Sequence, residues 1–152
     1  MRHTVTTDID ATPADVWKVL SRVEQWPEWT PSITSVRMLG RGPLEVGKRV
    51  LIRQPRLPPA LWRVTELEER VGFTWVSRTP GVEVHAGHWI EPSGQGSRVR
   101  LSIQYGGIFG RLMWRLLRGI TERYVAMEAE GLRRRVMRTD PVSSLLRERT
   151  DS

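Results

Sequence analysis

The stretch ATPADVWKVLSRVEQWPEWTPSI, residues 11–33, decides how this chain is interpreted. Its first part predicts a short helix, because Thr12 suits the N-cap and Pro13 suits the first helical position, while Val16 and Leu20 begin an apolar stripe. Its second part is too rich in proline for a long helix, so only a short helical turn through VEQW is expected. Two short helices are therefore predicted to follow one another near the start of the chain.

Trp26 and Trp29 lie three residues apart in this stretch. At that spacing both rings can lie on one side of a short helical turn, where each buries about 150 to 250 Å². One interpretation packs both rings into the core, and we favour it for Trp26. The other gives Trp29 a place in the wall of a ligand-binding cavity, and the sequence leaves that choice open.

On either side of this stretch the apolar pattern has the period of two that is typical of strands. Residues 2–9 predict an opening strand, and six further alternating segments follow from residue 33, separated by turn sequences such as GRGP, RLPP and PSGQG. Because the connections are short, an antiparallel meander is favoured. The sequence therefore predicts one sheet of seven antiparallel strands.

After the last predicted strand the apolar period returns to 3.6. A broad apolar face predicts one long helix over residues 108–138, and Pro141 is expected to end it. Residues 1–138 then form a single domain and residues 139–152 a polar C-terminal tail. A sheet and a helix that each have one apolar face can bury each other, which predicts an α+β helix-grip fold: a curved seven-stranded antiparallel sheet wrapped around the C-terminal helix, with two short helices after the first strand.

Composition places the 152-residue chain among globular domains, with 39% hydrophobic and 27% charged residues. The chain contains no cysteine, which excludes disulfides, thiolate metal sites and a cysteine nucleophile. Neither a targeting segment nor a membrane-spanning apolar run is visible, so we expect a cytoplasmic protein.

The chain carries a net charge of +7, and of its 24 basic residues only Lys18 and Lys48 are lysines. No zinc motif, recognition helix or aromatic RNA-binding signature accompanies this charge, so no nucleic-acid partner is expected. The long helix is rich in arginine, but its apolar face is needed to close the core. The arginines are therefore expected to be solvated and not to contact a membrane.

The chain resembles the START-like (SRPBCC) superfamily of helix-grip proteins, and within it the polyketide cyclase/dehydrase and lipid-transport branch. The resemblance rests on residues 11–40, on GHWIEPSGQGSRVRLSIQY at 87–105, and on GGIFGRLMWRLL at 106–117. The W-P-x-W that follows a PADVW-type helix is fairly specific to the superfamily. The resemblance implies a deep cavity between sheet and long helix that accepts an apolar small molecule, and it implies no fixed catalytic set.

Within VEVHAGHWIE, residues 82–91, alternate side chains point to opposite faces of the sheet. The side chains that share the parity of Glu83 and Glu91 should face solvent, so His88 is expected to point inward among apolar neighbours. An inward imidazole can hydrogen-bond a ligand or transfer a proton, which makes His88 the candidate catalytic residue; the alternative is a core histidine satisfied by a neighbouring group. His85 points the other way, so the two histidines cannot share a metal ion and no metal site is expected.

Further candidates for a cavity wall are aromatic or lie on the apolar face of the long helix. Tyr124 needs a partner for its hydroxyl if it is buried, and Tyr105 shares the parity of inward-facing neighbours. The predicted ligand-binding residues are Trp29, Trp62, Trp75, His88, Tyr105, Leu116, Ile120 and Tyr124. This set suits a flat aromatic or polycyclic ligand, and it serves a plain core equally well. Arg53 and Arg63 are expected to point outward.

Three functions fit this pattern. The first is a protein that binds a hydrophobic small molecule, with His88 and Tyr124 orienting it. The second, suggested by the resemblance, is a polyketide cyclase/aromatase-type enzyme that uses the same cavity and His88 as acid or base. The third is an interaction or stress-type protein with a filled core. No nucleophile motif or phosphate-binding loop is present, so no cofactor is expected, and a homodimer stays open.

Overall fold

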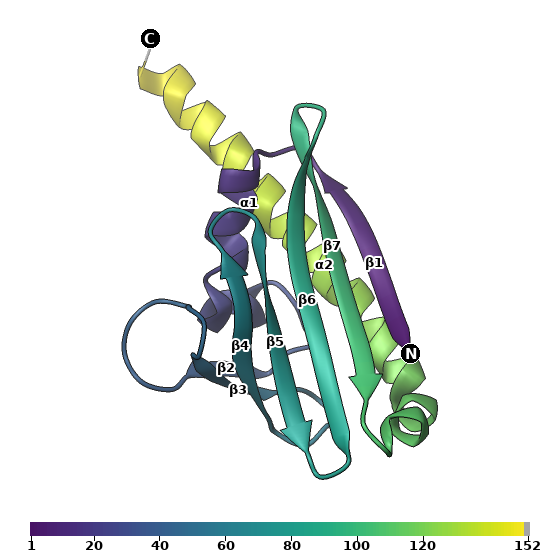
Figure 1. The fold of residues 1–152 in the computed structure, drawn as a ribbon. Coiled ribbons are helices and arrows are strands. Elements are labelled where there is room, and N and C mark those ends of the chain that lie inside the picture. Colours follow the sequence, from purple (N-terminus) through teal and green to yellow (C-terminus); the bar gives the residue numbers. More distant parts are fainter. Residues whose placement is uncertain (151–152) are drawn as a thin grey trace.

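The computed structural model describes the backbone of residues 1–150 and the side chains of residues 1–138 (Figure 1). The elements follow one another in the order β1 (Arg2–Ile9), α1 (Pro13–Leu20), η1 (Val23–Glu28), β2 (Ser35–Met38), β3 (Arg49–Arg53), β4 (Ala60–Glu68), β5 (Gly72–Thr79), β6 (Val82–Ser93), β7 (Gly96–Gly106) and α2 (Gly110–Thr150). The η1 element is a 3-10 helix. The order of elements predicted from the sequence is confirmed.

The seven strands form one antiparallel sheet in the order β1-β7-β6-β5-β4-β3-β2. Strands β2 to β7 are a meander, and β1 closes the edge by pairing with β7, with Thr4 opposite Ser102. In β4 the pairing register shifts between Val64 and Glu66, an irregularity of the kind that increases the bend of a strand. α2 lies across one face of this sheet, beside β7 and β1 (Figure 1). The predicted helix-grip fold is therefore confirmed.

The two short helices begin and end for the reasons that the sequence suggests. The Thr12 hydroxyl oxygen accepts a hydrogen bond of 3.2 Å from the backbone N–H of Asp15, and Pro13 occupies the first turn of α1. Pro27 lies inside η1, which is only six residues long. The short helices then turn the chain toward β2.

The long helix differs from the prediction at its C-terminal end. α2 continues through Pro141 to Thr150, so the predicted end at residue 138 is wrong. A proline removes one backbone hydrogen bond and crowds the preceding turn, but a helix can continue past it with a bend when the flanking residues favour helix. Leucine, arginine and glutamate, which favour helix, predominate after residue 144. The description of residues 139–152 as a polar tail concerns side chains outside the described residues.

α2 approaches Trp29, the residue that follows η1, so closely that a glycine is required at the contact. A Cβ atom added to Gly131 would lie 2.1 Å from the carbonyl oxygen of Trp29 and 3.0 Å from its ring. Real Cβ atoms do not come that close to a backbone atom, so any larger residue at 131 forces the helix away. Trp29 thus helps to set the distance between α2 and the rest of the fold.

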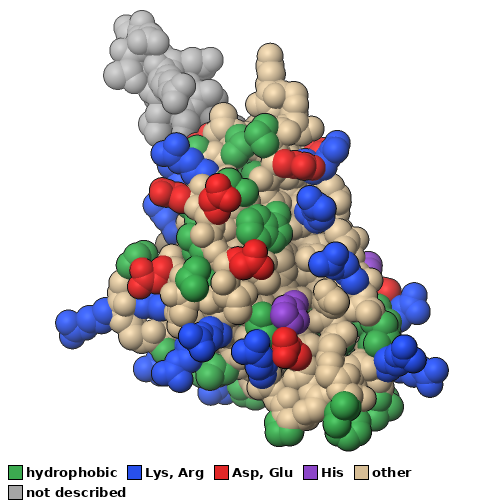
Figure 2. Space-filling model, in the orientation of Figure 1, with side chains coloured by type: hydrophobic (Ala, Val, Ile, Leu, Met, Phe, Trp, Pro, Cys, Tyr) green, Lys and Arg blue, Asp and Glu red, His purple; other side chains and the backbone are tan. Residues whose placement is uncertain are grey.

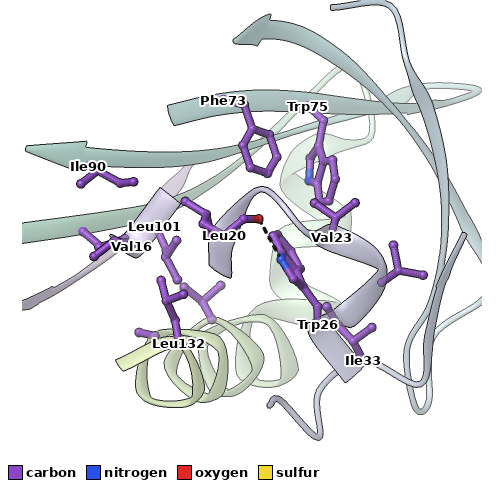
Figure 3. Packing of buried hydrophobic residues seen from close by; sticks show 14 of the residues in the cluster. Val16, Leu20, Val23, Trp26, Ile33, Phe73, Trp75, Ile90, Leu101 and Leu132 are labelled. Carbon is purple, nitrogen blue, oxygen red and sulfur yellow. Dashed lines mark hydrogen bonds between the residues drawn. The ribbon is translucent and has the colours of Figure 1, made fainter. Parts of the chain in front are cut away.

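The hydrophobic core lies between the short helices, the sheet and residues 125–136 of α2 (Figure 3). Trp26 is 2% exposed, and its indole N–H donates a 3.0 Å hydrogen bond to the carbonyl oxygen of Leu20, drawn as the dashed line in Figure 3. Phe73 and Leu132 pack in the same cluster from the sheet and from α2. The packing role predicted for Trp26 is confirmed.

Charged side chains of both signs are interspersed over the face shown in Figure 2. Cross-strand ion pairs also occur at the surface: Arg98 and Asp8 are 3.0 Å apart on β7 and β1. Such exposed pairs each contribute about 0 to 1 kcal/mol to stability. Arg53 and Arg63 are exposed, as predicted. No helix among the described residues is both long and apolar enough to cross a bilayer.

Candidate functional site

A cavity of about 200 Å³ lies between the inner face of the sheet and α2. Strand alternation builds its sheet wall: Val84, Ala86 and His88 line the cavity from β6, every second residue of that strand. Their partners on the neighbouring strands line it too, Trp75 opposite Ala86 on β5 and Leu101 opposite His88 on β7. The inward parity predicted for His88 is confirmed.

The opposite wall comes from one face of α2. The residues that form it are spaced mainly by three or four positions, as the helical period requires: Met113, Leu117, Thr121, Tyr124, Val125 and Glu128. The loop between β3 and β4 adds Gln54, Leu57 and Pro58. The wall is mainly apolar, with a few polar groups distributed over it.

Five of the predicted ligand-binding residues line this cavity: Trp62, Trp75, His88, Tyr105 and Tyr124. The structure places the other three elsewhere. Leu116 is 68% exposed, Ile120 is half-buried outside the wall, and Trp29 lines a separate surface groove together with Gly131. The apolar face at the start of α2 is so broad that periodicity did not distinguish Leu116 from its inward-facing neighbour Leu117. As ligand contacts, all eight residues stay predictions.

His88 is enclosed by aromatic rings. Its ring stacks on Phe73 with 4.4 Å between centroids, and the rings of Trp26 and Trp75 lie 5.3 and 5.2 Å away. Nδ1 is 3.4 Å from the carbonyl oxygen of Phe73, and because a carbonyl only accepts, Nδ1 carries the proton. Nε2 is then left as a hydrogen-bond acceptor.

Burial lowers the pKa of His88 to about 3, because desolvation disfavours the charged imidazolium more than the bond to Phe73 favours it. The imidazole is therefore neutral near pH 7. It can accept a hydrogen bond from a ligand, but so low a pKa makes it a poor acid or base at neutral pH. The alternative interpretation, a core histidine satisfied by a neighbouring group, holds for Nδ1, because that nitrogen is bonded to the backbone carbonyl of Phe73.

The two tyrosines that line the cavity each form a hydrogen bond through the side-chain hydroxyl to another element of the cavity wall. The Tyr105 hydroxyl on β7 lies 3.0 Å from the Thr121 hydroxyl on α2, and burial raises the pKa of Tyr105. The Tyr124 hydroxyl donates a hydrogen bond to the carbonyl oxygen of Pro55 in the β3–β4 loop. Both hydroxyls have the partner that burial demands, and together they link α2 to the sheet and to that loop.

Glu128 is a cavity residue that the sequence interpretation missed. It lines the cavity, yet it forms no hydrogen bond or ion pair with any residue that the structure describes. Desolvation raises the pKa of its carboxyl to about 7. A signal was present in the sequence: Glu128 is four residues after Tyr124 and four before the fully buried Leu132, so it belongs to the apolar stripe.

A second unpaired polar group lies in the sheet wall, on β4. The indole N–H of Trp62 is buried and has no hydrogen-bond partner in the described part of the chain. Buried donors are nearly always paired in native proteins, so this N–H and that of Trp29, which is also unpaired, are exceptions among the described residues. Within residues 1–138, no group of three or more His, Asp or Glu side chains is placed to hold a metal ion.

Comparisons with solved structures agree with this architecture. An aromatase/cyclase from Streptomyces sp. R1128 superimposes with a TM-score of 0.73 at 15% identity, covering 91% of this chain and 94% of the other. Norcoclaurine synthase from Thalictrum flavum, in complex with dopamine and hydroxybenzaldehyde, gives 0.71 at 15% identity, covering 91% and 87%. A START superfamily protein from Mycobacterium smegmatis gives 0.68 at 16% identity, covering 91% and 98%. At these identities the likeness is one of fold.

No protein with a curated description matches the sequence as a relative. The family model described as polyketide cyclase / dehydrase and lipid transport, however, matches residues 1–137, which include every strand, both short helices and the part of α2 that lines the cavity. The chain therefore belongs to the polyketide cyclase/dehydrase and lipid-transport family.

Proposed function

We propose that this protein binds a compact, apolar, ring-containing small molecule in the cavity between the sheet and α2. The observation that carries the proposal is the cavity itself, which leaves about 200 Å³ unfilled between the sheet and α2. This is below the roughly 300 to 1,000 Å³ of pockets that hold drug-sized ligands, so a small ring system fits the cavity better than a whole long-chain lipid does.

The wall chemistry supports a ligand with aromatic character. Trp26, Trp62 and Trp75 border the cavity, and Trp62 and Trp75 lie 6.0 Å apart with their rings tilted by 39°. Flat rings stack well on such surfaces, and each Å² of apolar ligand surface removed from water contributes about 25 cal/mol. Similar folds hold ligands of this kind: norcoclaurine synthase has been seen with dopamine and hydroxybenzaldehyde.

A cavity-filling substitution tests the proposal. Ala86 lies in the middle of the sheet wall, so Ala86→Phe should occupy the space and weaken the binding of an apolar fluorescent probe by about tenfold or more, which corresponds to one lost aromatic contact. Ala126→Phe is the matched control, because Ala126 is exposed on α2 and should leave binding unchanged. Native mass spectrometry on freshly purified protein would show any retained natural ligand. Equal binding by both variants would reject the cavity as the site.

A second candidate is a cyclase-type enzyme that uses the same cavity. The carboxyl of Glu128, with a pKa of about 7, supports it, because proton transfer is most efficient when the pKa lies near the working pH. Incubation with a reactive poly-β-carbonyl chain tests it. Products in the same ratio as in spontaneous cyclisation would reject catalysis. The third function considered, an interaction protein with a filled core, is disfavoured by the cavity.

A further inference from the structure

We propose that Glu128 is the group that recognises the ligand, and that the cavity selects apolar molecules carrying a basic nitrogen over matched alcohols and carboxylates. This inference rests on the binding function proposed above and adds the chemical class of the ligand to it. It assigns Glu128 as a binding residue whose partner is absent from the protein itself.

The placement of Glu128 is the first argument. It lies on the cavity face of α2, one helical turn beyond Tyr124. The other polar side chains named in that wall have partners: Thr121 binds Tyr105, Tyr124 binds Pro55, and Gln54 donates a 3.3 Å bond to the carbonyl oxygen of Ser32. Glu128 has none among the described residues. An unpaired carboxyl in an apolar cavity is costly for the fold, and this cost is removed when a ligand pairs with it.

The charge balance of the cavity is the second argument. The titratable groups that face Glu128 across the cavity are His88 from β6 and Tyr105 from β7, with Tyr124 beside it on α2. His88 is neutral, because its pKa is about 3, and the pKa of Tyr105 is raised. Neither arginine, lysine nor aspartate lines the cavity from β3 to β7, from the β3–β4 loop or from the described part of α2. No protein cation therefore compensates the Glu128 carboxylate.

An ammonium group on the ligand would supply the missing charge. It would pair with Glu128, and the tryptophan rings of the wall would add cation–π attraction. A ligand carboxylate would instead bring a second negative charge next to Glu128 inside a poorly solvated space. The net charge of +7 by itself favours an anionic ligand. Salt largely screens exposed arginines that lie more than a Debye length away, which is about 8 Å at physiological salt. The local carboxyl therefore decides the selectivity.

The pH dependence follows from the same carboxyl. Its pKa of about 7 means that Glu128 is protonated in acid and ionised in mild base, whereas an alkylamine stays charged throughout this range. Amine affinity should therefore fall by about tenfold in all as the pH drops from ~7 to ~5, and it should level off above this range, where Glu128 is ionised, and below it, where Glu128 is protonated. A neutral ligand of the same shape should show no such rise.

The test uses three indole compounds that differ mainly in the terminal group: tryptamine, tryptophol and indole-3-acetate. Calorimetric titration of the wild-type protein between pH ~5 and pH ~8 should give tryptamine about tenfold higher affinity than tryptophol at the upper end, no preference at the lower end, and the weakest binding for indole-3-acetate. Glu128→Gln should remove both the preference and the pH dependence. Glu130→Gln is the matched control, because Glu130 is paired with Arg134 at the surface.

Each outcome discriminates. If tryptophol binds as tightly as tryptamine at pH ~8, or if Glu128→Gln keeps the preference, the assignment of Glu128 is overturned while the binding function stands. If none of the three compounds nor any apolar probe binds the wild-type protein, both proposals fail. The wild-type pH profile is informative by itself, so the test remains decisive even if Glu128→Gln does not fold.

Discussion

His88 on the sheet wall and Glu128 on the helix wall are the two ionisable groups whose pKa the cavity shifts most, and they are held in different ways. His88 is enclosed by the rings of Phe73, Trp26 and Trp75, and its Nδ1 is bonded to a backbone carbonyl. Glu128 has neither a ring cage nor a bonded partner in the described structure. The sheet wall around His88 thus resembles a finished core, while the helix wall leaves a charge-bearing group free for a ligand.

The difference also reverses the roles that the sequence suggested. Histidine is the usual acid–base residue near neutral pH, but burial moves the pKa of His88 down to about 3 and out of the useful range. The same desolvation moves the pKa of Glu128 up to about 7 and into that range. Burial disfavours the charged form in both cases, so a cation and an anion shift in opposite directions.

The largest expected loss of stability comes from removing Trp26, whose ring packs against Phe73 and His88. Trp26→Ala should lower the free energy of unfolding by about 3 to 5 kcal/mol, because it removes a fully buried ring that contacts both Phe73 and His88. Urea denaturation measures the loss. A loss below about 1 kcal/mol would mean that this wall is not close-packed and that its rings can rearrange.

The pH dependence of stability tests His88 next. Its pKa is about 3 in the folded protein and 6.5 when unperturbed, so the unfolded state binds more protons in between and stability falls as the pH drops below 6.5. Between pH ~6.5 and pH ~5 this amounts to about 2 kcal/mol. His88→Leu should remove that part of the acid sensitivity in urea denaturation at the two pH values. His85→Leu, at a half-buried position on the outer face of β6, is the control.

Glu128 should have the opposite effect over the same range. Its folded pKa of about 7 lies above the ordinary 4.5, so the folded state holds the proton longer and stability falls as the pH rises from about 4.5 to 7. The contribution is about 2 kcal/mol over one and a half pH units, less any relief by water in the cavity. Glu128→Gln should therefore make stability rise with pH where the wild-type curve is nearly flat. An unchanged curve would show that Glu128 already has a partner.

The sequence predicted which side chains point into the cavity better than it predicted the distance between α2 and the sheet. Alternation in β6 placed His88 inward, because a strand allows only two sides. On α2 an apolar face of more than half a turn includes both Leu116 and Leu117, and only packing against the sheet selects Leu117. The cavity volume depends on the separation between α2 and the sheet, which is set by contacts such as Gly131 with Trp29. No pattern of residue types encodes that distance.

At Glu128 and Pro141 the position in α2 matters more than the residue type. Glu128 is absent from the predicted cavity residues, although the apolar stripe of Tyr124 and Leu132 runs through it. Pro141 by its type predicts the end of the helix, but helix-favouring residues follow it and α2 continues to Thr150. In both cases the neighbouring turns of the helix outweigh the average preference of one side chain.

The smallest predicted loss of stability comes from removing either tyrosine hydroxyl, and the two variants are distinguished by their effect on the β3–β4 loop. Tyr124→Phe removes the hydrogen bond to Pro55 and should cost about 1 kcal/mol of stability, while hydrogen exchange in the β3–β4 loop becomes faster. Tyr105→Phe is the matched variant: it should cost a similar amount but leave that loop unchanged, because its partner Thr121 lies on α2. If the Tyr124 link holds the loop over the cavity, Tyr124→Phe alone should also speed ligand release. Equal loop exchange in the two variants would mean that the loop is held by Leu57 and Pro58 packing on the cavity wall, and not by the Tyr124 hydroxyl.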